Sequence, residues 1–264
     1  MKIALAFVLA AAPAFADVSP AWDDLRPALY GETELYPAEG IITLDVPYRT
    51  MTDSRTPFGL TVAAPEGIRS VSVILDNNPM PVSARVDLAV PQNSLHFEAT
   101  LRINGPTPYH VVAEGADGRI YVTEGFLKTS GEGACAAPPG TDPVLALETL
   151  GEMELAVGRE TGGAVEVLSA LAGGQTDLTV DIRHPSNSGM QRDQVSLLFI
   201  PARFVETVDV TVDGAPYAQV TGSISLSEDP QLSLSIPGDA HRVDVLMTDT
   251  DGAVSAATRS LAAY

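Results

Sequence analysis

The clearest pattern in the sequence is an alternation of apolar and polar side chains with a period of two. Between Leu95 and Asn104, the residues Leu, Phe, Ala, Leu and Ile alternate with polar or charged ones, which is typical of a strand with one buried face. The same alternation predicts further strands at 41–46, 58–63, 70–75, 109–113 and 119–128, and in the second half at 178–183, 207–212, 232–236 and 243–247. Many short strands with turn residues between them predict an all-β fold, which we divide into two antiparallel β-sandwich domains.

Turn dipeptides separate several of these strands. Asp117-Gly118, Asp213-Gly214 and Asp251-Gly252 each stand between two apolar segments. Asp-Gly is favoured in the tight turns of β-hairpins, because both central residues of such turns take positive φ angles. We therefore predict a hairpin at each of the three sites.

A short helix is predicted before the first strand. Ser19 suits the N-cap, Pro20 the first helical position and Gly31 the stop. One face of the helix is apolar and is predicted to pack on the first domain; it carries Trp22, Leu25 and Leu29.

The alternation stops between residues 129 and 143, which read T-S-G-E-G-A-C-A-A-P-P-G-T-D-P. This composition is typical of a linker, and we name the stretch the cysteine arm. Thr141 or Asp142 is predicted to cap a short linker helix that ends near Leu150. We therefore divide the chain into a signal peptide (1–16), a first sandwich domain (17–128), the cysteine arm with its linker helix (129–159) and a second sandwich domain (160–264).

The first sixteen residues have the pattern of a secretory signal peptide. Lys2 precedes an apolar run at 3–12, and Ala14-Phe15-Ala16 is a small-x-small cleavage signal. The apolar run is shorter than the ~20 residues that span a bilayer. We expect export to the periplasm and no membrane partner.

Charge narrows the classes of partner. The chain has 34 Asp and Glu against 15 Lys and Arg, a formal net charge of -19. Such a surface repels phosphate backbones, so nucleic-acid binding is excluded, whereas a basic protein would be attracted. The alternative is that the acidity only keeps an exported protein soluble.

The chain has a single cysteine, Cys135. A lone thiol in an oxidising compartment is buried and inert, reactive, or paired with another molecule. Its neighbours are small, so we expect an exposed sulfur on a flexible arm. The residues expected to set the flexibility of the arm are Gly131, Gly133, Pro138, Pro139 and Gly140.

No neighbouring residue lowers the pKa of this thiol, and a thiol reacts as its thiolate. Activation is therefore expected from a partner, which favours a covalent carrier over an enzyme. The alternative interpretation is an incidental thiol on a linker.

Other chemistry is weakly indicated. His96, His110, His184 and His241 lack the spacing of a metal site, so we predict no metal and no cofactor beyond a cargo on Cys135. His96 is expected to be a solvated surface residue, and His184-Pro185 to open a structural turn. Residues 249–252 start like a calcium loop, but the acidic residue at its far end is missing. Nucleophile elbows and phosphate-binding loops are absent.

Short motifs in the first half resemble SoxY, the sulfur-carrying subunit of bacterial thiosulfate oxidation. They are residues 76–81 (D-N-N-P-M-P), the strand around Leu101-Arg102-Ile103, Asp117-Gly118, and a cysteine on a Gly-rich arm. The second half resembles SoxZ at 184–193 (H-P-S-N-S-G-M-Q-R-D), 200–205, Ile224-Ser225 and 228–230. The whole is similar to fused SoxYZ-like carriers associated with quinoprotein dehydrogenases.

The resemblance implies two immunoglobulin-like sandwiches that pack together, with Cys135 as the carrier thiol for sulfur intermediates. It implies periplasmic oxidoreductases as partners: a quinoprotein dehydrogenase, a cytochrome or Sox-type enzymes. In SoxY the arm is a chain terminus that reads G-G-C-G-G, whereas here it is internal, and alanine and Glu132 replace glycines. A different class of function stays open, namely a non-catalytic module that docks on such an oxidoreductase.

Overall fold

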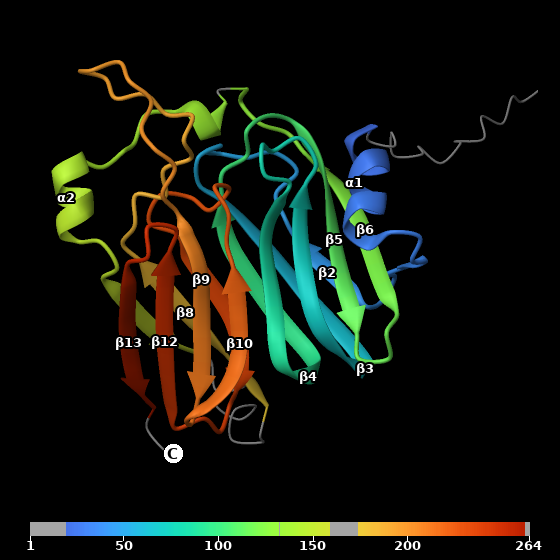
Figure 1. Cartoon of the computed structure of the whole chain (residues 1–264). Coiled ribbons are helices and arrows are strands. Elements are labelled where there is room, and N and C mark those ends of the chain that lie inside the picture. Colours follow the sequence, from blue (N-terminus) through green and yellow to red (C-terminus); the bar gives the residue numbers. More distant parts are fainter. Residues whose placement is uncertain (1–19, 132, 159–173, 262–264) are drawn as a thin grey trace, which may run out of the picture.

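The computed structural model describes residues 20–131, 133–158 and 174–261 (Figure 1). The predicted signal peptide, Ser19, Glu132 and the predicted start of the second domain at 160 lie outside these residues. The first part comprises α1 (Pro20–Tyr30), β1 (Leu35–Pro37), β2 (Ile42–Asp45), β3 (Thr56–Leu75), β4 (Val82–Leu101), β5 (Thr107–Gly115), β6 (Ile120–Leu127), η1 (Ala134–Ala136) and α2 (Pro143–Glu148). The second part comprises β7 (Met153–Val157), β8 (Gln175–Ile182), β9 (Val205–Val212), β10 (Ala215–Thr221), β11 (Gln231–Pro237), β12 (Arg242–Asp249) and β13 (Val254–Ser260).

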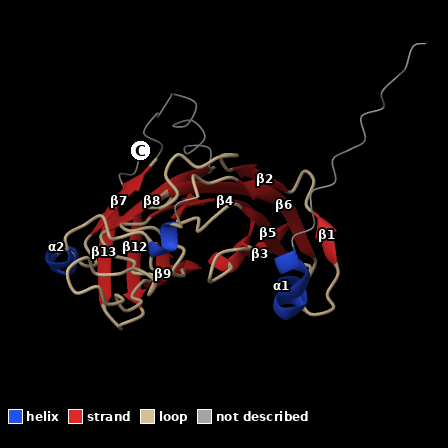
Figure 2. Cartoon of the chain, turned by 90° about the horizontal axis from the view of Figure 1, so that it is seen from above, coloured by secondary structure: helices blue, strands red, loops and turns tan. Residues whose placement is uncertain are grey.

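The fold is all-β, as the alternation predicts, and its strands form two facing layers (Figure 2). Strands β3 and β4 are each 20 residues long and take part in both layers. In one layer the order is β1-β6-β5-β3-β4-β10-β9-β12-β13, and in the other β2-β3-β4-β11-β8-β7. The β3–β4 ladder changes register between Ala63 and Ser70, which is where the two strands pass from one layer to the other.

The two halves of the chain share their sheets. The N-terminal part of β4 pairs with β10, for example Val86 with Val220. Its C-terminal part pairs with β11, for example Phe97 with Leu234. The resemblance implies two sandwiches that pack on each other; the structure adds that backbone hydrogen bonds of β4 join the halves in both layers.

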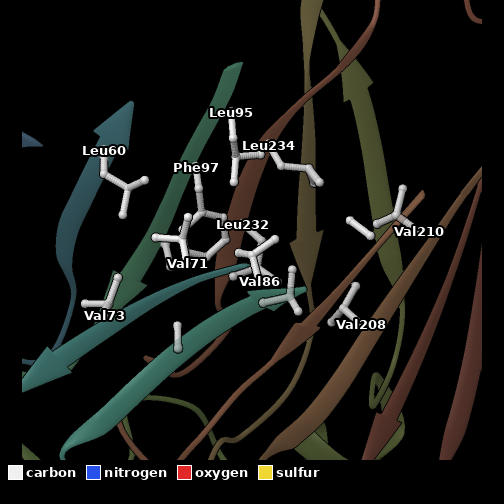
Figure 3. Close-up of a cluster of buried hydrophobic side chains, with 14 of the residues drawn as sticks. Leu60, Val71, Val73, Val86, Leu95, Phe97, Val208, Val210, Leu232 and Leu234 are labelled. Atoms are coloured by element: carbon white, nitrogen blue, oxygen red, sulfur yellow. The ribbon is translucent and has the colours of Figure 1, made fainter. Parts of the chain in front are cut away.

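One hydrophobic core fills the space between the layers and continues across both halves (Figure 3). Figure 3 shows residues of β3 and β4 (Leu60, Val71, Val73, Val86, Leu95, Phe97) beside residues of the second half (Val208, Val210, Leu232, Leu234). Apolar side chains alternate with polar ones along these strands, so every second residue enters this core. Because the core is continuous, the end of β4 is held rigidly against the second half.

Helix α1 begins and ends as predicted, and Gly31 follows it with a φ of 60°. The ring of Trp22 stacks on His110 of β5, with ring centroids 3.7 Å apart. The predicted apolar face is wrong at Leu29, which is exposed. Tyr30 is partly buried in its place, and burial raises the pKa of its hydroxyl to about 12.

Most predicted strands are confirmed, and so are the hairpins at the three Asp-Gly turns. The predicted strands 58–63 and 70–75 are parts of one strand, β3. Strands β1, β7, β10, β13 and the first half of β4 lay outside the predicted ranges. In the described part of the chain, no helix is long and apolar enough to cross a membrane.

Candidate functional site

Cys135 lies in η1, a single turn of 3₁₀ helix between β6 and α2, and its side chain is 0 % exposed. The expectation of an exposed sulfur is therefore wrong for this structure. The small neighbours have the opposite effect to the one expected: instead of leaving the thiol open, they let the turn pack closely against both halves. Gly133, with a φ of 66°, precedes the turn in the left-handed region that glycine tolerates.

The first half holds the cysteine arm at two points. Near its start, the backbone N–H and the hydroxyl of Ser130 both donate to the Asp53 carboxylate, the hydroxyl at 2.6 Å. At the thiol itself, the N–H of Cys135 donates to Oδ1 of Asn104 at 3.4 Å. Asn104 follows β4 by three residues, so the rigid end of β4 positions this contact.

The second half holds the arm at three points. The Ser188 hydroxyl donates to the carbonyl oxygen of Cys135, and Nε2 of Gln191 donates to that of Ala137 at 3.0 Å. Beyond the turn, the Glu228 carboxylate accepts the N–H groups of Gly140 and Thr141, each at 2.7 Å. Cys135 therefore sits at the junction of the two halves.

The loop that carries Ser188 is fixed by the buried His184. Its Nδ1 accepts a hydrogen bond from the N–H of Ser186 at 2.9 Å, and Nε2 lies 3.4 Å from the Asp249 carboxylate. Burial lowers the pKa of His184, although Asp249 works in the opposite direction. The structure thus confirms the predicted structural use of His184.

Arg102 is a buried cation at this site. It directly follows β4 and is 2 % exposed. Its Nη1 donates to the carbonyl oxygens of Leu226 (2.9 Å) and Ile224 (3.5 Å), and to that of Ser186. Burial lowers the pKa of Arg102, and the charges of Cys135 and Glu228 work in the opposite direction.

The thiol is held in its neutral form. Burial raises the pKa of Cys135 to about 11, although the charge of Arg102 lowers it. In the docked state the thiol is therefore shielded and unreactive at neutral pH, because the thiolate is the nucleophile. Reaction at Cys135 requires the arm to leave this position.

The remaining predicted arm residues lie around the thiol. Gly131 has a φ of 91°, Pro138 and Gly140 are exposed, and Pro139 is half-buried. Helix α2 follows, and Asp142 caps it by accepting the N–H groups of Val144 and Leu145, as predicted. The flexibility assigned to these residues stays a prediction.

Metal ligands do not gather near the thiol or elsewhere: the described residues contain no group of three or more His, Cys, Asp or Glu side chains that could hold a metal ion. His96 is half-buried, and its Nδ1 lies 3.3 Å from the Thr61 hydroxyl. His110 is buried, with Nδ1 2.9 Å from the Asp76 carboxylate.

Sequence reasoning did not assign a role to the residues that hold the arm. These are Asp53, Asn104, Ser188, Gln191 and Glu228. Three of them, Ser188, Gln191 and Glu228, lie in the motifs that carry the resemblance. These motifs match a family pattern, although their residues suggest no catalytic chemistry. That combination is the sequence signal that could have pointed to the residues that hold the arm.

Comparisons with known proteins find one family match in each half of the chain. Residues 26–135 match the family model described as Sulfur oxidation protein SoxY, and residues 165–260 match that of Sulphur oxidation protein SoxZ. The SoxY match ends at Cys135 itself. No curated protein sequence matches the chain significantly.

Two solved structures are similar to parts of the fold. The sulfur carrier protein SoxY from Chlorobium limicola f thiosulfatophilum is 18 % identical, with a TM-score of 0.37, over 42 % of this chain and 96 % of that one. Fibronectin(III)-like modules of Clostridium thermocellum CbhA are 13 % identical, with a TM-score of 0.24, over 83 % of this chain and 91 % of that one. On the two family matches, the chain joins a SoxY-family region and a SoxZ-family region in one polypeptide and is a SoxYZ-like fusion.

Proposed function

We propose that the protein is an exported carrier, not an enzyme, that holds a sulfur-containing or other thiol-reactive intermediate covalently on Cys135. The observation that carries this proposal is the position of Cys135. The only cysteine of the chain is the last residue of the SoxY match, and its carbonyl oxygen is held by Ser188 of the SoxZ region. A thiol placed where both regions meet is suited to presentation to other proteins by the two together.

The chemistry of loading follows from the thiol. A thiol cargo R–SH joins Cys135 as Cys–S–S–R, and the step releases two protons and two electrons. A periplasmic oxidoreductase accepts those electrons in this proposal; a quinoprotein dehydrogenase, a cytochrome and Sox-type enzymes are the candidates. The ordinary pKa of a thiol, 9.0, lies above neutral pH, so the partner also supplies the base that deprotonates Cys135 after the arm is released.

Intact mass spectrometry of the protein isolated from the periplasm tests the proposal. The protein is measured without reductant and again after reduction. A reductant-labile added mass that maps to Cys135 is expected, and its value identifies the cargo. A Cys135→Ser variant is the matched control: it should keep its fold and melting temperature and carry no added mass. A wild-type thiol that is always unmodified, together with full function of the serine variant in the host, would refute the carrier.

A second candidate is a non-catalytic module that docks on a periplasmic quinoprotein dehydrogenase or cytochrome. An exposed apolar loop favours it: Val195, Leu197, Leu198 and Phe199 are 94, 69, 70 and 60 % exposed. Apolar side chains gathered at a loop tip commonly mark an interaction surface. In this case Cys135→Ser should keep function, whereas replacing Leu198 and Phe199 by serine should abolish it.

A further inference from the structure

The hydrogen bonds of the buried His184 fix which of its ring nitrogens carries the proton. Nδ1 accepts the N–H of Ser186 at 2.9 Å, and the Ser186 hydroxyl lies 3.2 Å from the same nitrogen. A ring nitrogen that accepts a hydrogen bond has no proton. The proton of the neutral ring is therefore on Nε2, which lies 3.4 Å from the Asp249 carboxylate. The Ser186 N–H keeps its acceptor only while His184 is neutral.

This hydrogen bond holds a turn that the backbone does not favour by itself. Ser186 has a φ of 44°, in the left-handed region that residues with a Cβ seldom adopt. It is also completely buried, so its N–H depends on a partner within the protein. Protonation of His184 at Nδ1 would set two donors against each other. The turn would then lose the bond that compensates its strained conformation.

The turn leads directly to the contacts that hold the cysteine arm. Ser188 follows Ser186 by two residues, and its hydroxyl donates to the carbonyl oxygen of Cys135. The N–H of Ser188 donates to Oε1 of Gln191 at 3.1 Å, and Nε2 of Gln191 donates to the carbonyl oxygen of Ala137. Ser188 and Gln191 are both buried. A displacement of Ser186 therefore affects both hydrogen bonds by which this loop holds the arm.

Four charged residues surround His184 and its turn. Asp249 of β12 accepts a hydrogen bond from Nε of Arg203 at 2.7 Å, Asp229 accepts the N–H of His184 at 2.9 Å, and Arg102 donates to the Ser186 carbonyl oxygen. Burial lowers the pKa of His184; Arg203 acts in the same direction, and the two aspartates oppose it. Burial works to raise the pKa of Asp249, but the hydrogen bond from Arg203 holds it below its ordinary value. Asp249 therefore stays ionised when the pH falls below 6.5, and His184 is the group that responds.

We propose that His184 is a positioning residue whose protonation releases the cysteine arm, so that the thiol is docked at neutral pH and presented in mildly acidic surroundings. The inference rests on the proposed carrier function, since it concerns when the carrier thiol is presented. In the released state His184 is no longer buried and regains its ordinary pKa of 6.5. Below that pH the released state binds one proton more than the docked state, so falling pH favours release. Above it neither state is protonated, and docking is at full strength.

The test measures how strongly docking protects Cys135 at pH 7.5, 6.5 and 5.5. Methyl methanethiosulfonate is the probe: the Cys135 sulfur displaces methanesulfinate, loses its proton and forms a mixed disulfide, which intact mass detects. A synthetic peptide of residues 129–141 is labelled at each pH as the reference. Protection is the rate of the peptide divided by the rate of the protein, and this ratio removes the pH dependence of the thiol itself.

Protection of the wild type should fall about tenfold between pH 7.5 and 5.5, because the last pH lies one unit below the ordinary pKa of histidine. Ordinary carboxyl groups, with a pKa of about 4, stay ionised over this range. Protection that is constant from pH 7.5 to 5.5 overturns the proposal.

The variant His184→Asn separates protonation from structure. The Asn side-chain oxygen accepts the N–H two residues further on in an Asx turn, as Nδ1 does here, and it takes up no proton in this range. This variant should keep the protection that the wild type has at pH 7.5 and lose the pH dependence. His184→Ala should lose protection at every pH. His241→Asn replaces an exposed histidine and should behave as the wild type.

A pH dependence that persists in His184→Asn would come from another group, for example the buried His110, and would overturn the proposal. If His184→Asn does not fold, the wild type is compared with His110→Asn instead. Both must then lose protection at pH 5.5, and constant protection in either one refutes the role of His184.

The probe is a synthetic reagent, so the result does not depend on a natural cargo. An unmodified thiol in the periplasmic protein would count against the carrier function and leave the pH profile of protection unchanged. Constant protection would refute the role of His184 even where a natural adduct on Cys135 is found.

Discussion

Gln191 donates a hydrogen bond to the carbonyl oxygen of Ala137 at 3.0 Å, two residues beyond Cys135. Together with the Ser188 hydroxyl, which donates to the carbonyl oxygen of Cys135, it ties the thiol-bearing turn to the second half. Both contacts are single hydrogen bonds to an otherwise loop-like segment. Each contact contributes only on the order of 1 kcal/mol, so the loss of either one should loosen the thiol-bearing turn.

Removing one of these bonds should expose the thiol more often. We expect Gln191→Ala to raise the rate of Cys135 alkylation by iodoacetamide in the native protein by about fivefold, since one hydrogen bond contributes on the order of 1 kcal/mol. Ser188→Ala should act in the same direction. The wild-type rate itself should be far below that of the urea-unfolded chain, because the docked thiol is 0 % exposed. Labelling is followed by intact mass at pH 8.

Gln219→Ala is the matched control for this experiment. Gln219 also makes one side-chain hydrogen bond, to Asp209 at 2.7 Å, but it lies on β10, away from the arm. Its substitution should leave the alkylation rate at the wild-type value. If Gln191→Ala behaves like Gln219→Ala, the Gln191 contact does not hold the arm.

The buried thiol should make stability depend on pH in the alkaline range. Burial raises the pKa of Cys135 to about 11 from its ordinary value of 9.0. Between these values the unfolded chain loses the thiol proton while the folded chain keeps it, so the free energy of unfolding falls as pH rises. Two pKa units correspond to a loss of about 3 kcal/mol once the pH is above both values.

Cys135→Ser isolates this effect, because its hydroxyl does not ionise in that range. The free energy of unfolding is measured in urea at pH 8.0 and 10.5 for the wild type and the variant. Between these two pH values the wild type should lose more stability than the variant. A constant difference would mean that the thiol ionises as it does in the unfolded chain, and hence that the arm is already undocked in solution.

Asn78 joins the two halves near the site, and its loss should be costly. Its Nδ2 donates to the Arg102 carbonyl oxygen at 2.8 Å and to the Ser225 hydroxyl at 2.9 Å, and its Oδ1 accepts the N–H of Asn104 at 3.0 Å. Asn78→Ala removes all three hydrogen bonds at a buried position, so we expect a loss of about 3 kcal/mol in unfolding free energy. The neighbouring Asn77 is exposed and serves as the control. Asn77→Ala should cost much less, and equal losses would contradict the proposed role of Asn78.

The sequence predicted the strands well where one face alone is buried. The stretch from Leu95 to Leu101 alternates cleanly, and the structure places it in β4 with every apolar residue in the core. The sequence pattern missed the first half of β4, where the polar residues Ser83 and Arg85 interrupt the apolar positions. Ser83 is buried, and Arg85 is bonded to Ser70 and Ser72 across the sheet. Polar residues in a strand of this kind are stabilised by hydrogen-bond partners far along the chain. The periodicity of a single segment does not reveal those partners.

The site shows the same limit. Cys135 could be singled out from the sequence because it is the only thiol, but its burial could not. The residues that bury it come from segments 31 to 93 positions away, for example Asn104 and Glu228. Small residues around a thiol permit either an open arm or a closely packed turn, and only the long-range contacts decide between the two.

Trp22 should anchor α1 to the first half. Its ring stacks on the His110 ring at 3.7 Å with an interplanar angle of 7°, and His110 is itself 3 % exposed. Trp22→Ala removes this stack and exposes the His110 ring and the Asp76 carboxylate bonded to it, so we expect a loss of about 3 kcal/mol in unfolding free energy. Trp22→Phe keeps an aromatic ring in place and should lose less than half as much. Circular dichroism in urea measures both variants, since Trp22 is the only tryptophan and its fluorescence disappears with it. In the wild type the tryptophan fluorescence reports on α1 alone, so it can be compared with the circular-dichroism signal of the whole fold. A fluorescence transition at a much lower urea concentration than the circular-dichroism transition would show that the helix detaches independently. It would also show that the stack contributes little to the stability of the β-sheets.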